Sequence, residues 1–281
     1  MAGRFRSWTA GPRKVVRHVS LPRLVRLELD GDIKTVAAML KHLMLPVVKD
    51  VRLTGSFNER MHGGVETQAM FCRLAQLLMP DGDGTLPITE LSLSQHFSGA
   101  FHFMGTVRHA AAGRDPTSLD LRLHTGSEDL SSSFTFDTLF PEVLSAIQSR
   151  APLSLSIARL NLFAPQWFDA LSRHVAVIQS ISIDGASFDS FFDFLRIGYV
   201  DAIGEVLPHL EVLRLREFAP SDVMRWVIVV WLRARMDRKA ALRKLVFDRC
   251  RRDTLPGRWL DELREVMSDR DYNAVVVENP M

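Results

Sequence analysis

Two similar stretches near the N-terminus define a pattern of apolar and polar positions. Residues 21–32, LPRLVRLELDGD, and residues 45–56, LPVVKDVRLTGS, each contain Leu-Pro, an aliphatic-x-x-aliphatic-x-Leu core and a polar stretch with glycine. Apolar and polar residues alternate in each core, which is typical of a strand with one buried face. The pattern therefore predicts a repeated unit that contains a short strand.

The same core recurs from one end of the chain to the other. Nine copies can be aligned, and the copies at 118–123 and 272–277 are weaker than the rest. Successive copies are on average 31 residues apart, which is long enough for one strand and one helix. We therefore predict nine strands, centred on Leu27, Val51, Leu91, Leu121, Leu160, Ile181, Leu213, Leu245 and Val275.

Between the copies, apolar residues recur with the spacing of a helix rather than a strand. Ser187 and the pair Ser221-Asp222 offer N-caps, because their side-chain oxygens can accept hydrogen bonds from the free N–H groups of a first helical turn. The chain is therefore predicted to alternate strands with helices. The expected helices lie at 35–45, 65–79, 136–148, 165–175, 221–236 and 256–267.

Two architectures alternate strands and helices in this way. A doubly wound α/β sheet covers both faces of its central strands, whereas a leucine-rich-repeat solenoid leaves one sheet face in water. The in-between strand residues are polar in seven of the nine copies, which favours the solenoid. We predict an α/β solenoid with a parallel concave sheet of eight or nine short strands and helices on the convex side. Residues 1–20 are expected to be a basic, irregular segment, and residues 21–281 a single domain.

One slot of the standard repeat is unusual in this chain. The third residue after the last strand aliphatic is normally Asn or Cys, whose side chain hydrogen-bonds the backbone of the turn. Only Cys250 meets this requirement. Without a ladder of such residues, the solenoid is expected to be an irregular arc.

Composition indicates a soluble protein without a strong charge bias. The formal net charge of the 281 residues is +2, and two cysteines are too few for a disulfide framework. The N-terminus lacks the apolar run of a signal peptide. The most apolar helical stretch, 223–232, contains Arg225 and is too short to span a bilayer. We expect a cytoplasmic or nuclear protein with no membrane partner.

The repeats resemble a known family. The stretches 21–55, 206–223 (VLPHLEVLRLREFAPSDV) and 241–250 (ALRKLVFDRC) are similar to the leucine-rich-repeat halves of F-box proteins from mushroom-forming fungi, and the likeness extends from residue 21 to about residue 279. The resemblance implies a non-enzymatic protein-binding module, like the substrate-recognition half of a ubiquitin-ligase subunit. Family members usually begin with an F-box, which docks a cullin–RING adaptor. Residues 1–20 contain nothing similar, so that adaptor is expected as a partner only if an F-box lies upstream.

Motifs for catalysis or metal binding are few. The chain has no phosphate loop, His-Glu-x-x-His, Gly-x-Ser-x-Gly or Cys-x-x-Cys sequence. The stretch 81–84, DGDG, resembles the start of a calcium loop but lacks its later ligands, so a turn is predicted. His102 and His109 could share a helix face, yet no carboxylate follows at a matching spacing, so a structural role is favoured. Cys72 is expected to be a buried thiol, and no enzyme activity, cofactor or metal is expected.

A basic segment, residues 231–258, contains ten Lys and Arg against three Asp. Such a segment could bind an acidic partner or nucleic acid. It could equally be the solvated end of a helix, with arginine stems that cover apolar surface. We favour the second interpretation, and nucleic acid is not an expected partner.

Solenoids of this kind bind proteins on the concave sheet, so the outward strand positions are the candidate site. The predicted patch lies on the central strands and mixes charges of both signs, which suits a protein better than a phosphate backbone. Two alternatives stay open: an enzyme with catalytic groups on loops such as 96–116 or 124–135, and an anion-binding or nucleic-acid-binding role of residues 231–258. The candidate binding residues are Arg122, His124, Arg159, Asn161, Phe163, Asp184, Arg214 and Arg216.

Overall fold

The chain divides into two compact α/β units, Met1–Ala151 and Pro152–Met281, called here the N-terminal and C-terminal units. In each unit the sheet is open and mostly parallel. The computed structural model describes residues 2–5, 19–45, 47–57, 63–78, 88–95, 101–107, 115–125, 152–159, 171, 177–184, 188–200, 207–238, 240, 242–267 and 274–280.

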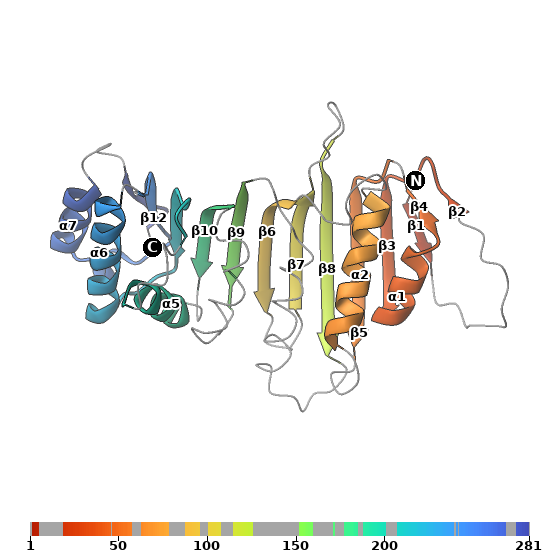
Figure 1. Ribbon diagram of the computed structural model, residues 1–281, viewed down its shortest axis with the longest axis horizontal. Coiled ribbons are helices and arrows are strands. Elements are labelled where there is room, and N and C mark those ends of the chain that lie inside the picture. The colour runs from red at the N-terminus through yellow and green to blue at the C-terminus, as the bar shows by residue number, and fades with distance from the viewer. Residues whose placement is uncertain are drawn as a thin grey trace. The chain divides into compact units, whose positions relative to one another are not determined.

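The N-terminal unit contains a mixed sheet (Figure 1). Its strands are adjacent in the order β1, β3, β5, β8, β7, β6. The first four are parallel, whereas β7 runs antiparallel to both β6 and β8. A second, two-stranded parallel sheet joins β2 and β4. The bounds are β1 Ala2–Phe5, β2 Val19–Ser20, β3 Arg26–Asp32, β4 Leu43–Met44, β5 Asp50–Phe57, β6 Ile88–Gln95, β7 Phe101–Val107 and β8 Thr117–Thr125.

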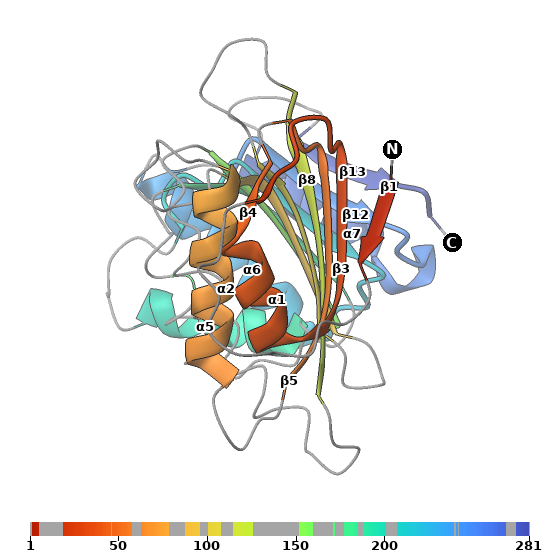
Figure 2. The ribbon, with the colours of Figure 1, turned by 90° about the vertical axis from the view of Figure 1, so that its right-hand side faces the viewer.

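Helices α1 (Ile33–Leu40) and α2 (Gly63–Leu78) lie on one face of this sheet (Figure 2). Alternate strand residues point at them and are buried, and the ring of Phe71 on α2 meets that of Phe103 on β7 edge to face at 5.3 Å. Helix α1 begins where Asp32 accepts a hydrogen bond from the backbone N–H of Thr35, at 3.0 Å. The apolar half of the strand pattern therefore forms the core of the unit.

The described part of the C-terminal unit has five parallel strands in chain order, namely β9 (Leu153–Ala158), β10 (Ile178–Asp184), β11 (Val212–Arg216), β12 (Lys244–Asp248) and β13 (Val275–Glu278). The predicted strand centres Ile181, Leu213, Leu245 and Val275 pair in direct register. The repeat found in the sequence is thus a real structural repeat in this unit. The helices whose bounds the structure describes here are α5 (Phe188–Val200), α6 (Asp222–Asp237) and α7 (Gly257–Met267), with the 3-10 helix η2 at Arg252–Thr254.

A chain of aromatic rings fills the core between these strands and helices. Phe188 on α5 lies 4.7 Å from Phe218, measured between ring centroids, and Phe218 stacks on Phe247 of β12 at 6.4 Å. Phe247 in turn meets Trp259 of α7 edge to face at 5.4 Å. Buried aromatic pairs add to the hydrophobic stabilisation, so these ring contacts help to hold α5 and α7 against the same strands.

The predicted α/β class with a mostly parallel sheet is confirmed, but a wholly parallel sheet is wrong. The predicted helices at 136–148 and 165–175 lie outside the described residues, except for Leu171. Residues 96–116, interpreted as a loop, include β7, whose buried Phe103 and Val107 alternate with His102 and Thr106. Only 96–100 separates β6 from β7, and a link that short permits an antiparallel hairpin but no parallel crossover.

The fifth predicted strand, at 157–162, is also misplaced. Strand β9 spans Leu153–Ala158, and Leu153, Leu155 and Ile157 point into the core. The serines between them are small but still supply the polar half of the alternation. Leu160, which was predicted as the centre of this strand, lies outside the described residues.

Four strands of the C-terminal unit are followed directly by a residue in the left-handed backbone conformation. These residues are Arg159, Glu217, Arg249 and Asn279, with φ values of 59°, 55°, 53° and 46°. The N–H of Glu217 donates to the carbonyl of Asp248 at 2.9 Å, and that of Arg249 to the carbonyl of Glu278 at 3.1 Å. Each such turn ends a strand at the same level as its neighbour, so the last strand residues come to lie side by side.

Candidate binding face of the sheet

In both units, alternate strand residues point away from the helices, and we call this side of the sheet the open face. Charged residues of both signs occupy it, and most are at least partly exposed. In the C-terminal unit the open face carries Ser154, Ser156, Ser180, Ser182, Asp184, Arg214, Arg216, Lys244, Val246, Asp248, Val276 and Glu278.

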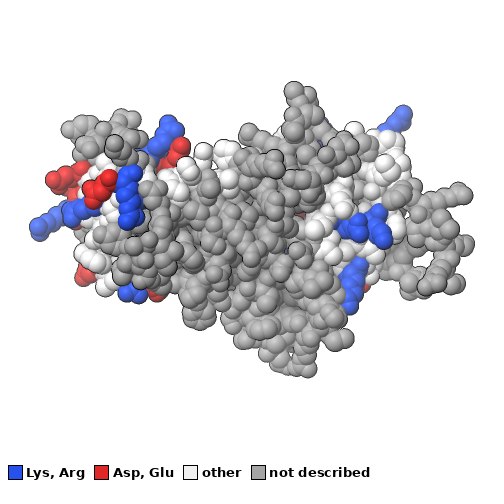
Figure 3. Space-filling view, in the orientation of Figure 1, with Lys and Arg blue, Asp and Glu red and all other residues white. Residues whose placement is uncertain are grey.

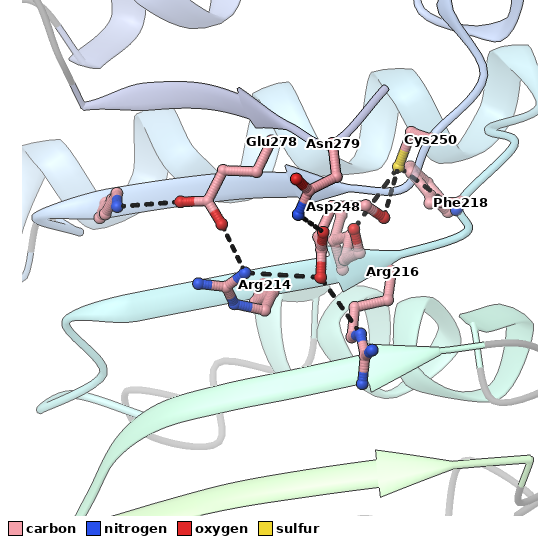
Figure 4. Close-up of polar contacts among 9 residues, drawn as sticks. Arg214, Arg216, Phe218, Asp248, Cys250, Glu278 and Asn279 are labelled. Atoms are coloured by element: carbon pink, nitrogen blue, oxygen red, sulfur yellow. Dashed lines mark hydrogen bonds and ion pairs between the residues drawn. The ribbon is translucent and has the colours of Figure 1, made fainter. Parts of the chain in front are cut away.

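A network of polar side chains lies at the ends of the last three strands (Figure 4). We call it the strand-end cluster: Arg214, Arg216, Asp248, Glu278 and Asn279. Asp248 is its centre, with Arg214 Nη1 at 3.5 Å and Arg216 Nε at 3.3 Å from Oδ2, and Asn279 Nδ2 at 3.1 Å from Oδ1. Arg214 Nη1 also donates to Glu278 Oε2 at 2.7 Å.

Strand register explains why these groups meet. Arg216, Asp248 and Glu278 are direct partners across β11, β12 and β13, so three charges lie in one row. Arg214 lies two residues before Arg216 on β11, directly opposite Val246 of β12. Its guanidinium reaches Glu278, which is two strands away. Neighbouring strands are about 4.8 Å apart, so the stem of Arg214 has to cross β12 above Val246.

The cluster keeps its carboxylates ionised. Burial alone would raise the pKa of Asp248, but the hydrogen bond from Asn279 and the guanidiniums of Arg216 and Arg214 outweigh it and hold the pKa below its ordinary value. The hydrogen bond from Arg214 is the main cause that lowers the pKa of Glu278. Charge-assisted bonds of this kind fix both partners in place, so the arginines are held before any ligand binds.

Asp184, at the end of β10, has a raised pKa, in contrast to the lowered pKa values of Asp248 and Glu278. Burial raises the pKa of its carboxyl group, and the charge of Arg216 only partly offsets this. Its Oδ1 accepts a hydrogen bond from the backbone N–H of Arg159 at 3.2 Å. The predicted residues Arg159, Asp184, Arg214 and Arg216 therefore lie on or beside three adjacent strands, with Arg159 in a turn rather than on a strand.

In the N-terminal unit, Asp120 of β8 is the centre of a similar arrangement. His102 Nε2 of β7 lies 2.8 Å from Asp120 Oδ1, and Arg122 Nη2 lies 3.3 Å from Oδ2. Burial would raise the pKa of Asp120, but His102 and Arg122 together lower it. His102 is thus on a strand and paired with a carboxylate, not on a helix face with His109 as the sequence suggested. His124 is exposed on β8 beyond Arg122.

The predicted central patch is divided by this topology. Strand β8 pairs with β5 on one side and β7 on the other, so the predicted fourth and fifth strands are not neighbours. Arg122 and His124 belong to the N-terminal unit, whereas Arg159, Asp184, Arg214 and Arg216 belong to the C-terminal unit. Asn161 and Phe163 lie outside the described residues.

Sequence reasoning missed the partners that organise each part of the face. Glu278 and Asn279 were not selected, because the final copy is too apolar to suggest a polar strand end. The shared repeat position was the available signal, since Glu278 occupies the slot of Arg216 and Asp248 in its own copy. Asp120 was not predicted as a site residue, since its contact with His102 depends on the unpredicted strand β7.

Cys250 occupies the slot in which the repeat pattern predicts a contact with the turn backbone, and that contact is confirmed. Its Sγ accepts from the N–H of Phe218 at 3.4 Å and lies 3.5 Å from the carbonyl oxygen of Leu215. Burial raises the pKa of this thiol, so it is the neutral form that bonds. The prediction of a buried Cys72 is wrong, because the thiol lies on the exposed side of α2.

In the described part of the basic segment 231–258, four cations have acidic partners and a fifth, Arg235, is buried. Arg235 is the largest departure from the expected solvated face, because it is only 5% exposed. Its guanidinium donates to the carbonyl oxygens of Leu207 at 2.7 Å and Leu210 at 2.9 Å, and it lies 5.0 Å from the ring centroid of Trp231. The four cations with acidic partners form the ion pairs Arg233–Glu262, Arg243–Glu211, Lys244–Glu278 and Arg251–Asp253.

Comparisons with known proteins add no relative. No family model, curated protein or solved structure matches the chain. The helices in the described part of the chain are all too short or too polar to cross a membrane. Within the same residues, no three His, Cys, Asp or Glu side chains are grouped to hold a metal ion.

Proposed function

We propose that the chain is a non-enzymatic protein-binding module that binds its partner on the open face of the sheet. Its role would resemble that of the substrate-recognition half of an F-box leucine-rich-repeat ubiquitin-ligase subunit. The observation that carries the proposal is the strand-end cluster, in which Arg214 and Arg216 are held by Asp248 and Glu278 on a partly exposed sheet face.

Preorganisation is the physical reason for this proposal. A free arginine loses rotamer entropy when it binds, and ion pairs that already fix it reduce that cost. Arginine is also enriched among the residues that dominate protein–protein binding energies. Because charges of both signs alternate on this face, a partner with complementary charges would be selected, whereas a uniformly anionic polymer would meet Asp184, Asp248 and Glu278.

The alternative of nucleic-acid binding by residues 231–258 has less support. Arg235 is buried, and Arg233, Arg243 and Arg251 have acidic partners within the fold. Pairing of this kind reduces the number of cations that could replace counterions on a phosphate backbone.

Affinity purification with matched variants tests the proposal. Arg122→Ala and Arg216→Ala each remove a partly exposed arginine from the open face, and each is expected to weaken partner binding by about 1–3 kcal/mol. Arg196→Ala on α5 and Arg264→Ala on α7 remove paired arginines from the helix side and serve as controls. Loss of binding in the helix variants but not in the sheet variants would contradict the proposal.

The ligase role requires a separate test. The same purification is done with a full-length transcript product, and recovered proteins are searched for cullin–RING components. Their recovery supports the ligase role. If a partner binds the open face but no such components are found, the module binds proteins outside a ubiquitin ligase.

A further inference from the structure

Helices α6 and α7 of the C-terminal unit form a groove on the side of the unit away from the open face. The groove has a volume of about 400 Å³, and Trp226, Val229 and Trp259 form its apolar floor and wall. Trp226 is 62% exposed and Val223, one turn before it, is 68% exposed, so apolar surface continues from the groove onto α6. Exposed tryptophan beside arginine is typical of a protein-binding surface rather than of a solvated helix.

The stripe of α6 along this groove has an unusual order of residues. Asp222, Trp226, Val229 and Arg233 are spaced by four, three and four residues, so they lie on one side of the helix over about 16 Å. An acid begins the stripe, two apolar residues follow, and a base ends it. If a second copy of this stripe is turned end for end, each acid faces a base and the apolar residues face each other.

We propose that a second copy of this chain binds here, with the two α6 helices antiparallel about a two-fold axis that passes between residues 227 and 228. In this arrangement Asp222 of each chain faces Arg233 of the other, and the exposed Trp226 side chains of the two chains meet beside the axis, above the buried floor that Val229 forms in each groove. A two-fold interface has to be complementary to itself, and this stripe meets that requirement.

Charge on the groove favours a second copy over an acidic or a basic partner. Acidic Asp222 and Glu262 line it together with Arg225, Arg233 and Arg258, and the space-filling view shows both signs side by side over this part of the unit (Figure 3). Asp222 is 93% exposed although it pairs with Arg225, and Arg233 is 59% exposed although it pairs with Glu262. Each can therefore accept a second partner of opposite charge, whereas a uniformly charged ligand would meet repulsion.

Sedimentation equilibrium with a charge exchange tests the proposal. The wild-type chain is expected to be a reversible dimer with a dissociation constant on the order of micromolar, because a single pair of helices buries a small area. Asp222→Arg or Arg233→Glu alone places like charges opposite each other twice per dimer, and each is expected to raise the dissociation constant about tenfold or more. The double variant Asp222→Arg/Arg233→Glu restores opposite charges across the axis and should recover most of the dimer.

Controls on another helix separate this effect from a change in fold. Asp193→Arg and Arg196→Glu make the same substitutions in an exposed ion pair of α5, and both should dimerise like the wild type. Trp226→Ala should dissociate the dimer while its far-ultraviolet circular dichroism stays unchanged. A monomer at every concentration up to about 200 μM, or a double variant no better than its single parents, would overturn the proposal. Arg216→Ala on the open face should leave the dimer intact, so this test is independent of the proposed function.

Discussion

Arg214 on β11 and Glu278 on β13 are joined across the strand between them, with 2.7 Å from Nη1 to Oε2. The residue beneath that link, Val246 of β12, has no exposed surface although it is on the open face. Arg214 is therefore an ion-pair partner and also the cover of an apolar side chain. This double role explains how a valine can occupy a position that is polar in most other strands.

The two roles of Arg214 can be separated by mutation. Arg214→Ala removes the cover and the charge together, and we expect it to lower the free energy of unfolding by about 1–3 kcal/mol. Glu278→Gln removes only the partner charge from a partly exposed pair, so a loss of about 0–1 kcal/mol is expected. Urea denaturation of both variants measures the difference, and equal losses would show that the arginine stem does not cover Val246.

Acid should weaken the strand-end cluster. The pKa values of Asp248 and Glu278 are lowered in the fold, so the unfolded chain takes up protons first as the pH falls. Their stabilisation is complete above the ordinary values of 3.8 and 4.5 and is lost as the pH drops through the lower folded values. Arg214→Gln should therefore make stability less dependent on pH below about pH 5. Urea midpoints between pH 6 and pH 3 test this, and an unchanged slope would contradict it.

Arg235 should be a stability residue rather than a binding residue. Arg235→Met keeps most of the side chain but removes the guanidinium donor from the carbonyl oxygens of Leu207 and Leu210, and only that of Leu207 keeps a second donor, the N–H of Leu210 at 3.1 Å. A buried acceptor without a partner is costly, so a loss of about 1–3 kcal/mol is expected. Arg238→Met, an exposed neighbour, should change stability by less than about 0.5 kcal/mol. Thermal unfolding followed by circular dichroism compares them, and similar melting temperatures would contradict the structural role of Arg235.

Much of the fold could be predicted because one face of each strand is buried. The alternation of apolar and polar residues located β3, β5, β10, β11 and β12, and capping by Ser221 located the start of α6. Strand β7 was missed because two of its residues obscure the alternation of apolar and polar positions. Gly105 occupies a buried position without a side chain, and His102 lies between Phe101 and Phe103. The antiparallel direction of β7 was missed for the same reason. A short connection permits only an antiparallel pair, and the short connection between β6 and β7 could not be recognised while β7 itself was not predicted.

The candidate site was less predictable, because ion pairs depend on strand order and register. Arg214 and Arg216 could be placed on the open face from the pattern alone, but the link from Arg214 to Glu278 spans two strands and about 60 residues of sequence. Burial of Arg235 was equally hidden, since nothing in a basic helix end indicates that two carbonyl groups from a preceding turn lie within its reach.

Arg249 and Arg251 offer a matched test of the left-handed turns that end the strands. Both are exposed arginines close together in sequence, but Arg249 has a φ of 53° and Arg251 a φ of −69°. A side chain in the left-handed region costs about 1–2 kcal/mol, and glycine avoids that cost at the price of a more flexible unfolded chain.

We therefore expect Arg249→Gly to leave the free energy of unfolding unchanged or to raise it by up to about 1 kcal/mol. Its N–H still donates to the carbonyl of Glu278. Arg251→Gly has no backbone strain to relieve and should lower stability by about 0.5–1 kcal/mol. Arg249→Val, which is β-branched, should be destabilising. Urea denaturation of the three variants decides the matter: if both glycine variants lose the same stability, the turn after β12 stores no strain, and the repeated left-handed residue is a consequence of the sheet rather than a constraint on it.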